Sequence, residues 1–244
     1  MPVAYDVIGD VHGCFEELLD VLARLGYACS GGTLTPPPGR QVVFVGDLVD
    51  RGPRIAAVVR LVMDAVQRGT ALCVRGNHDE RLARALQGEA VETSKSLLVS
   101  LDQLSAVSEA ERDAMRRFLA SLPARLELDG GRLLVVHAGE LKSDDPDERE
   151  QFNVWGRRSG RSRADGADGP VDWVTDYTGP ALVVYGHTSV LEPDWRGRTV
   201  NLDTGCVFGG TLTAMRYPEL TLVSVPARQA YASTAHWRAL SARA

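Results

Sequence analysis

Residues 7–15 read VIGDVHGCF, and this stretch passes from a strand pattern into a turn that carries an acid and a histidine. The run over residues 4–8 is typical of a buried strand, and residues 15–25 carry apolar side chains at helical spacing. Asp10 and His12 stand between glycines, which allow the chain to turn sharply there. The stretch therefore predicts a strand, a turn that bears polar side chains suited to chemistry, and a helix.

The same alternation continues along the first third of the chain. After a loop rich in glycine and proline over residues 31–38, residues 41–45 and 70–74 read as strands. Residues 53–68 between them read as a helix, with Pro53 at its start. Strands that alternate with helices predict βαβ units and a mostly parallel sheet.

The middle of the chain changes character. Residues 78–121 are helical in pattern and predict an insertion or cap. Residues 125–129 and 132–137 predict a hairpin, because the turn between them reads Asp-Gly-Gly. Residues 140–172 are polar and poor in pattern, and we expect a loop at residues 157–169 that borders the substrate.

The end of the chain turns to β structure. The strand patterns there cover residues 181–186, 198–203, 211–217 and 220–226. Nothing in the sequence reads as a linker between two cores. We therefore expect one domain over residues 1–226, followed by a loosely held tail over residues 227–244.

Composition argues against several classes of protein. The net charge of −5 does not suit a protein that holds nucleic acid by bulk electrostatics. The longest apolar runs are strand-sized, which argues against a membrane protein, and the first residues lack the pattern of a secretory signal. The four cysteines form no CxxC motif and read as reduced thiols. We therefore expect a cytoplasmic protein.

Polar side chains of metal-ligand type follow five of the predicted strands. The motifs are GDVHG (9–13), GDLVDRG (46–52), GNHD (76–79), HAG (137–139) and GHT (186–188). The carboxyl ends of strands in an open α/β sheet converge on one crevice, so these residues can meet there. Four of the five histidines fall in these motifs, and only His236 lies outside them. One such histidine would usually be structural, but the set favours a metal site.

The residue types narrow the choice of metal. Carboxylate, imidazole and amide oxygen without thiolate suit Mn²⁺, Fe or Zn²⁺ at a hydrolytic centre. Six candidate ligands are too many for one four-coordinate ion but suit two. The candidates are Asp10, His12, Asp47, Asn77, His137 and His187. The sequence therefore predicts a site for two divalent ions that act together on a phosphorus centre.

Taken in order, the five motifs resemble the calcineurin-like metallophosphoesterase superfamily, in its phosphoprotein-phosphatase branch. FVGDLVDRGP (44–53), VVYGHT (183–188) and LDTGCVFGGTLTAMRYPE (202–219) also resemble the phosphatase domain of bacterial polynucleotide kinase-phosphatase and the bacterial symmetrical diadenosine tetraphosphate hydrolases. The chain lacks the GxxxxGK[ST] phosphate-binding loop of a kinase. The resemblance implies an α/β fold, a two-sheet β-sandwich flanked by helices in αββα order.

The resemblance also implies roles for the ligand-type residues. Asp10 and His12 would bind the first ion, and Asp47 would bridge both. The remaining three candidates would complete the second ion; they are Asn77, His137 and His187. A hydroxide held between the two ions would then attack phosphorus in line.

Three further residues would act on the substrate in such an enzyme. His78 would be the general acid that protonates the leaving oxygen, since imidazole can supply a proton near neutral pH. Asp50 would orient His78. Arg51 would hold phosphate oxygens, because a guanidinium fork fits two of them.

Other positions carry weaker predictions. Arg75 either touches phosphate or braces nearby acids. Arg157 and Arg158 follow a Trp-Gly pair and either lie near the phosphate or belong to a solvated basic loop. Asp203 is a candidate partner for a ligand histidine, and Asp79 a candidate brace. Trp155, Tyr185 and Cys206 are expected to be packing residues.

Three functions stay open from the sequence. The first is a two-metal phosphomonoesterase that acts on a nucleotide, a nucleic-acid end or a phosphoprotein. The second uses the same site to cleave the phosphoanhydride of a dinucleoside tetraphosphate. The third is a metal-dependent scaffold without activity, which the complete ligand set disfavours.

Overall fold

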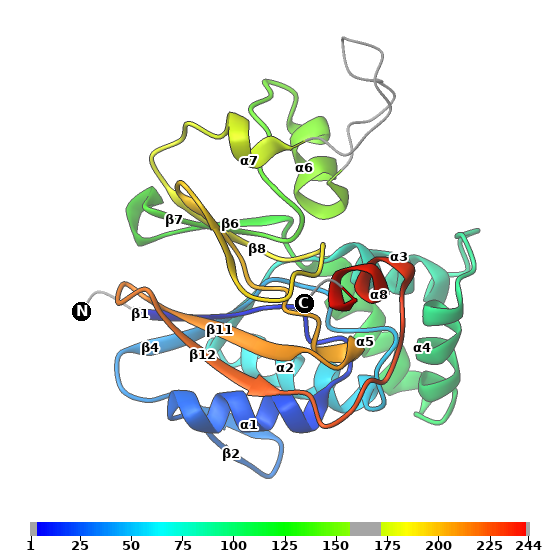
Figure 1. Ribbon diagram of the computed structural model, residues 1–244. Coiled ribbons are helices and arrows are strands. Elements are labelled where there is room, and N and C mark those ends of the chain that lie inside the picture. The colour runs from blue at the N-terminus through cyan, green and yellow to red at the C-terminus, as the bar shows by residue number, and fades with distance from the viewer. Residues whose placement is uncertain (1–3, 157–171, 243–244) are drawn as a thin grey trace.

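The computed structural model describes residues 4–156 and 172–242 and shows two five-stranded sheets packed face to face (Figure 1). The first sheet has the order β12-β11-β1-β4-β5. Its strands are β1 (Ala4–Ile8), β4 (Arg40–Phe44), β5 (Ala71–Cys73), β11 (Thr211–Tyr217) and β12 (Thr221–Pro226). Pairs β1–β4 and β4–β5 are parallel, whereas β1–β11 and β11–β12 are antiparallel.

The second sheet has the order β6-β7-β8-β10-β9. Its strands are β6 (Arg125–Leu128), β7 (Leu133–Val136), β8 (Leu182–Tyr185), β9 (Asp194–Arg196) and β10 (Thr199–Asn201). Strands β7, β8 and β10 run parallel, and antiparallel strands close both edges. The parallel βαβ arrangement expected from the first third of the chain is confirmed for β1, β4 and β5. Both sheets are nevertheless mixed, because antiparallel strands β11 and β12 extend the first sheet on one side and β6 and β9 form the edges of the second. Hairpin edges need no crossover helix, which is why the βαβ pattern could not reveal them.

Helices cover the outer face of each sheet. The helices are α1 (Phe15–Leu25), α2 (Ile55–Gln67), α3 (Asn77–Leu86), α4 (Lys95–Ser105), α5 (Glu109–Ser121), α6 (Pro146–Trp155), α7 (Trp173–Asp176) and α8 (Ala235–Ser241). Short 3₁₀ turns follow β6 and β10; they are η1 (Asp129–Gly131) and η2 (Cys206–Phe208). Helices α1 and α2 lie under the first sheet, and α6 and α7 lie over the second (Figure 1). This arrangement confirms the helix-flanked two-sheet fold.

The inner strands, such as β7, β8 and β10, are buried on both faces, which explains their continuous apolar runs. Val7 and Val43 of the first sheet face Leu133 and Val135 of the second in the core between the sheets. Alternate residues turn outward, so Ile8 packs among the helices of the first sheet instead. On the far side, Leu134, Val136 and Val183 form a third cluster with Phe152 and Trp173.

The predicted helical insertion is part of the first core. Leu97 and Leu104 of α4 and Met115 of α5 are fully or almost fully buried in the same cluster as the α1 and α2 side chains. Helices α4 and α5 contact α2 and α3. Residues 78–121 therefore form part of the wall of the fold beside the first sheet.

Several segments differ from the sequence expectation. A small hairpin of β2 (Ala28–Ser30) and β3 (Thr33–Thr35) lies in the expected glycine-rich loop. Helix α6 lies in the stretch expected to lack pattern, where Asp145 caps the helix by accepting the Asp147 N–H at 3.0 Å. Helix α2 starts at Ile55, two residues later than expected. A 3₁₀ turn, η1, makes the predicted hairpin turn.

The segment after β12 is pinned to the fold instead of being loosely held. The buried carboxylate of Glu17 accepts the Arg228 N–H at 2.9 Å and the Tyr231 hydroxyl at 2.8 Å. Trp237 of α8 is 9% exposed and packs on the ring of Phe208 at 5.8 Å between centroids. Hydrogen bonds to Glu17 and apolar contacts with the first core therefore hold the segment after β12 in place.

None of the described helices is both long and apolar enough to cross a bilayer.

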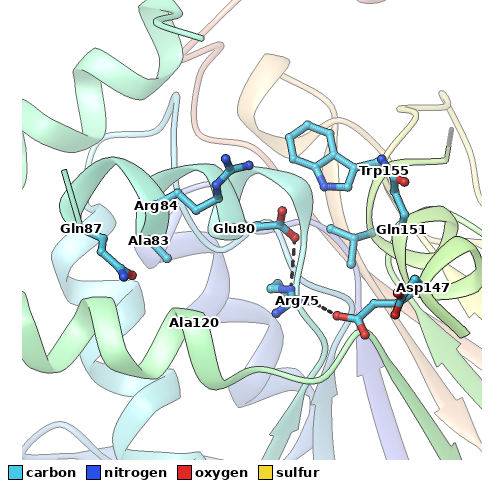
Figure 2. A pocket seen from close by; sticks show the side chains of 11 residues that line it. Arg75, Glu80, Ala83, Arg84, Gln87, Ala120, Asp147, Gln151 and Trp155 are labelled. Carbon is cyan, nitrogen blue, oxygen red and sulfur yellow. Dashed lines mark hydrogen bonds and ion pairs between the residues drawn. The ribbon is translucent and has the colours of Figure 1, made fainter. Parts of the chain in front are cut away.

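A pocket of about 710 Å³ lies between helices α3 and α6 (Figure 2). We call it the α3–α6 pocket. Its lining includes charged, amide and aromatic side chains, among them Arg75, Glu80, Arg84, Gln87, Glu150 and Trp155.

Candidate metal centre

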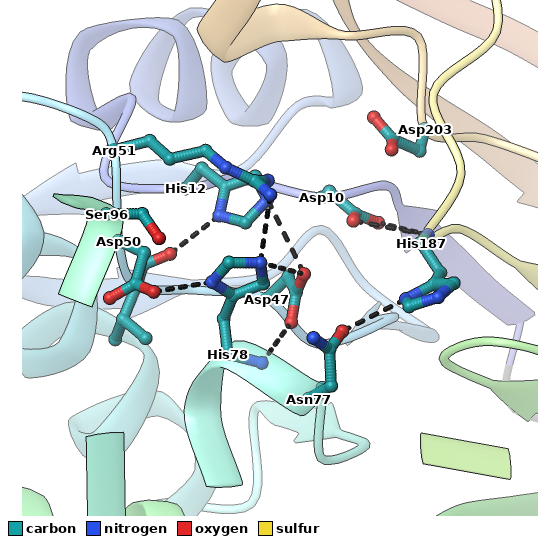
Figure 3. Close-up of polar contacts among 12 residues, drawn as sticks. Asp10, His12, Asp47, Asp50, Arg51, Asn77, His78, Ser96, His187 and Asp203 are labelled. Carbon is teal, nitrogen blue, oxygen red and sulfur yellow. Dashed lines mark hydrogen bonds and ion pairs between the residues drawn. The ribbon is translucent and has the colours of Figure 1, made fainter. Parts of the chain in front are cut away.

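The parallel strands of both sheets end at the same side of the sandwich, and the motif residues follow those ends. Asp10 comes after β1, Asp47 after β4 and Asn77 after β5, while His137 and His187 follow β7 and β8. Figure 3 shows the side chains from both sheets turned toward one another. The expectation that strand ends far apart in sequence would meet is thus met by the geometry.

Asp47 lies at the middle of the cluster. Its Oδ1 is 3.4 Å from Nε2 of His137, and its Oδ2 is 3.5 Å from Nε2 of His12 and 4.0 Å from Nε2 of His78. Two groups of potential ligands, each with donor atoms within 4.8 Å of one another, share this carboxylate. They are His12–Asp47–His78 and Asp10–Asp47–His137. Asp10 is therefore grouped with His137, whereas the sequence resemblance implied that Asp10 and His12 share one ion.

Asn77 joins the second group. Its Oδ1 lies 3.0 Å from Nε2 of His137 and 3.0 Å from Nδ1 of His187. The same two ring nitrogens are 3.2 Å apart. The backbone N–H of His187 points to the Asp10 carboxylate, at 3.2 Å from Oδ2. Three donor atoms, from residues that follow β5, β7 and β8, therefore lie within about hydrogen-bond distance of one another.

Backbone carbonyls orient two of the imidazoles. Nδ1 of His12 lies 2.6 Å from the carbonyl oxygen of Val49, and Nδ1 of His137 lies 2.9 Å from that of Val45. A proton on Nδ1 is therefore held by the backbone. Nε2 of each ring keeps its lone pair for the cluster, as a metal ligand requires.

The protonation states of the cluster follow from burial. Burial lowers the pKa of His12 and His137, and lowers the pKa of His187 to about 3. Burial alone would raise the pKa of Asp47, but the imidazoles around it, in their protonated forms, and the guanidinium of Arg51 lower that pKa well below its usual range. Burial, then the charges of neighbouring carboxylates, raises the pKa of Asp10. The site thus holds neutral rings beside carboxylates that repel one another.

The loops that carry these residues are conformationally strained. Seven described residues other than glycine have a positive φ, and five of them belong to the motifs. These five are His12, Asp47, Asp50, Arg51 and His187. Such backbone costs about 1–3 kcal/mol at each position and tends to gather at functional sites. The strain therefore marks this side of the sandwich independently of the ligand-type side chains.

Glycines make room for the two carboxylates. A β-carbon on Gly76 would lie 2.2 Å from Oδ1 of Asp47, and one on Gly186 would lie 2.0 Å from Oδ1 of Asp10. Any other residue would displace the carboxylate or the backbone. The glycines beside the motif residues are therefore required by close approach.

These observations fit a pair of divalent cations. Neutral imidazoles, carboxylates and one amide oxygen form the donor set, with no thiolate among them, as hard to borderline cations prefer. Two repelling carboxylates with a shared centre at Asp47 would be relieved by positive charge between them. The described residues could thus hold two ions, with Asp47 between the two groups.

A second network lies beside the first group of potential ligands. Nδ1 of His78 is 2.5 Å from Oδ2 of Asp50. Asp50 is fully buried, and its other oxygen accepts the hydroxyl of Ser100 at 2.5 Å. Arg51 places Nη2 at 2.9 Å from Nε2 of His78 and also contacts Nε2 of His12. The predicted association of these three motif residues is therefore present in the structure.

Sequence reasoning missed two members of this network. Ser100 reaches Asp50 from helix α4, fifty residues along the chain, and no local pattern marks it. Arg81 lies with Nη2 at 2.8 Å from Nδ1 of His78 and 3.6 Å from Oδ2 of Asp50. A helix that begins at Asn77 puts Arg81 on the same face as His78, so that signal was available.

The weaker predictions have mixed outcomes. Arg75 pairs with Glu80 at 3.4 Å and also with Glu150, so it braces acids in the α3–α6 pocket. Arg157 and Arg158 lie outside the described residues. Asp79 and Asp203 are both buried, and each carboxylate accepts hydrogen bonds from nearby backbone or side-chain donors. Asp79 accepts the N–H groups of Leu48 and Gly76, and Asp203 accepts from Ser189 and Gly205.

The model of the calcineurin-like phosphoesterase family matches residues 5–191. The chain is 40% identical to the asymmetrical bis(5'-nucleosyl)-tetraphosphatase PrpE of Anoxybacillus flavithermus, over 93% of this chain and 96% of that protein. It is 39% identical to the protein of that name from Bacillus subtilis, over 94% and 97% of the two chains. The name specifies asymmetrical cleavage, whereas the sequence resemblance points to the symmetrical class.

Solved structures agree on the fold. A structure assigned as a diadenosine tetraphosphatase has a TM-score of 0.69 and 24% identity, and covers 93% of this chain and 96% of that one. A serine/threonine phosphatase from Saccharomyces cerevisiae has a TM-score of 0.60 and 17% identity, over 96% and 82%. The family match, together with relatives of similar length, confirms the family predicted from the five motifs. The chain belongs to the calcineurin-like phosphoesterase family of metal-dependent hydrolases.

Proposed function

We propose that this protein hydrolyses a bis(5'-nucleosyl) tetraphosphate asymmetrically, so that one nucleoside monophosphate and one nucleoside triphosphate are released. The observation that carries the proposal is 40% identity over 96% of a relative that bears this activity in its name. The similarity extends over 93% of this chain, so it is not confined to a few short motifs. The partner of the site would then be a small nucleotide.

The six ligand-type residues are proposed to hold two divalent ions. Mn²⁺ is the proposed metal, with Fe and Zn²⁺ as alternatives that accept the same donors. The ligands are Asp10, His12, Asp47, Asn77, His137 and His187. Bound there, the ions would supply Lewis acidity for the phosphate group and for the attacking water. The cytoplasm is the proposed compartment, and the four free cysteines support it.

The neighbouring network is proposed to handle the leaving group. Asp50 fixes the ring of His78 through Nδ1, which leaves Nε2 turned toward Arg51. For His78 to act as the acid, Nε2 must bear a proton, so the guanidinium of Arg51 would turn from that nitrogen to the phosphate oxygens. Arg81 lies against the same imidazole and carboxylate and adds positive charge there.

A second candidate function is phosphomonoester hydrolysis. The hydrogen bond between Asp50 and His78 favours it, because it orients an imidazole toward proton transfer, and an alkoxide leaving group needs a proton more than a triphosphate does. Its substrate would be a nucleotide, a nucleic-acid end or a phosphoprotein.

One assay separates the two candidates. Mn²⁺-loaded protein and a chelator-treated control receive bis(5'-adenosyl) tetraphosphate or adenosine 5'-monophosphate, and the products are separated by ion exchange. We expect AMP and ATP in equal amounts from the tetraphosphate, in the loaded sample alone. Two molecules of ADP would contradict asymmetrical cleavage, and phosphate from AMP with an intact tetraphosphate would favour the second candidate.

The role of His78 has its own control. His78→Ala should slow hydrolysis of an alkyl phosphate more than hydrolysis of the tetraphosphate, since the triphosphate leaves as a weak base. His236→Ala is the matched control, because this histidine lies in α8 outside the motifs. Equal losses on both substrates would argue against proton transfer by His78.

A further inference from the structure

We infer that the α3–α6 pocket binds one nucleoside of the substrate, an inference that rests on the proposed function. Two residues that line the pocket are close to cluster residues along the chain or in space. Arg75 in its wall directly precedes Gly76 and Asn77. On the other wall, Trp155 is followed by Gly156, and a β-carbon there would lie 3.7 Å from Nε2 of His187. A ligand in the pocket can therefore reach the cluster through its 5'-phosphate.

The size and shape of the pocket suit a nucleoside. Its volume of about 710 Å³ lies within the range of roughly 300–1,000 Å³ typical of small-molecule sites. The indole of Trp155 faces Glu80 and Arg84 across the opening (Figure 2). Ala83, Ala120 and Val154 supply the apolar part of the lining. An aromatic wall above an apolar surface is what a flat base needs for stacking.

The polar groups of the pocket also match a nucleoside. Gln87 and Gln151 each offer a carboxamide that can both donate to and accept from a base. The carboxylates of Glu80, Asp147 and Glu150 can accept hydrogen bonds from the two hydroxyls of a ribose. These side chains come from α3 and α6, which face each other, so a ligand between them can contact both.

The charge of the lining argues for a neutral group over a phosphate. The pocket has two arginines against three carboxylates. Arg75 is already paired with Glu80 and Glu150, and Arg84 lies 2.7 Å from Glu89. Phosphate groups would meet little uncompensated positive charge there, whereas Arg51 offers it beside the cluster. The nucleoside is therefore assigned to the pocket and the phosphates to the metal side.

The test compares two tryptophans. Trp155→Ala removes the aromatic wall, and Trp195→Ala is the control because Trp195 is 40% exposed on β9. We expect Trp155→Ala to raise KM for bis(5'-adenosyl) tetraphosphate by about fivefold to a hundredfold, the range given by base–aromatic stacking. Hydrolysis of p-nitrophenyl phosphate, which has no nucleoside, should be impaired much less than hydrolysis of the tetraphosphate. Trp155→Phe should restore most of the affinity.

A binding measurement makes the test independent of turnover. Chelator-treated protein is titrated with adenosine by calorimetry, and binding should occur in wild type and Trp195→Ala but be lost in Trp155→Ala. The proposed function fails if wild type leaves the tetraphosphate intact while it cleaves p-nitrophenyl phosphate. The pocket assignment fails if Trp155→Ala leaves adenosine binding and KM unchanged, or impairs p-nitrophenyl phosphate equally. It also fails if the pocket takes a basic phosphopeptide in a Trp155-dependent manner but not adenosine.

Discussion

Replacing Gly186 by alanine should displace the Asp10 carboxylate while the fold stays intact. The new β-carbon would lie 2.0 Å from Oδ1 of Asp10 and 3.2 Å from Cγ2 of Val45. Carbon and oxygen in ordinary contact are about 3.3 Å apart, so the carboxylate must move by roughly 1.3 Å. The displaced atom ends a side chain, and Gly186 is not among the residues with positive φ. We therefore expect the Asp10 side chain to move and the backbone at Gly186 to keep its conformation.

A shift of this size should damage function severely. Misplacement by about 1 Å can cost a hundredfold in rate, and changes around metal ligands cost about 10–100-fold in metal affinity. We expect both effects in Gly186→Ala, measured as Mn²⁺ affinity by calorimetry and as kcat/KM on the tetraphosphate. Gly197→Ala is the control, because its site is open but its φ is +55°. The control should lose about 1–2 kcal/mol of stability and keep its metal affinity.

Gly186→Ala should therefore lose metal affinity but little stability, and Gly197→Ala should lose stability but no metal affinity. If Gly186→Ala binds Mn²⁺ as wild type does, Asp10 is not a ligand or does not lie where the structure places it. If its activity falls only in step with the unfolded fraction in a thermal melt, the damage is global and the reasoning from side-chain displacement is refuted.

Three other perturbations have defined outcomes. Ser100→Ala leaves Oδ1 of Asp50 without its hydroxyl donor and should cost about 1–3 kcal/mol in urea unfolding, with a lower kcat on alkyl phosphates that Ser100→Thr restores. The raised pKa of Asp10 means that its proton is held more tightly than usual, so Mn²⁺ must expel it. The affinity for Mn²⁺ should then fall as pH falls, beginning at a higher pH than an ordinary aspartate would give, with proton release seen by calorimetry in two buffers; pH-independent affinity would contradict this. Trp237→Ala should cost about 3–5 kcal/mol of unfolding free energy, whereas exposed Trp195→Ala should change it by less than about 0.5 kcal/mol. Equal melting curves for the two would show that α8 adds no stability.

The metal cluster was readable from the sequence because each part of it is local. Every motif pairs a strand end with ligand-type residues, and the rule that strand ends converge supplies the long-range step. Asp10 and His187 meet for this reason although 177 residues separate them. The helix-flanked sandwich followed from the same strand pattern and from the resemblance.

The missed features depend on contacts that no local pattern records. Ser100 is one polar residue on an amphipathic helix, and only the packing of α4 on α2 brings it to Asp50. The residues after Pro226 look sparse in sequence, yet Trp237 fills the space over Gly205 and Gly210. Helix α6 was missed for another reason. Its Asp145-Pro146 start is a helix signal that the polar surroundings obscured.

The strand order of the first sheet also sets a timetable for biosynthesis. Strand β1 lies between β4 and β11, with Tyr5 opposite Tyr217, so one of its two neighbours is made early and the other near the end of synthesis. At about 5–20 residues per second, the ribosome needs roughly 8–33 seconds to pass from β4 to β11. During that interval one side of β1 has open hydrogen-bonding groups, and a truncated chain would keep them open. A prematurely terminated product is thus both inactive and exposed to aggregation, which makes it recognisable to quality-control proteases.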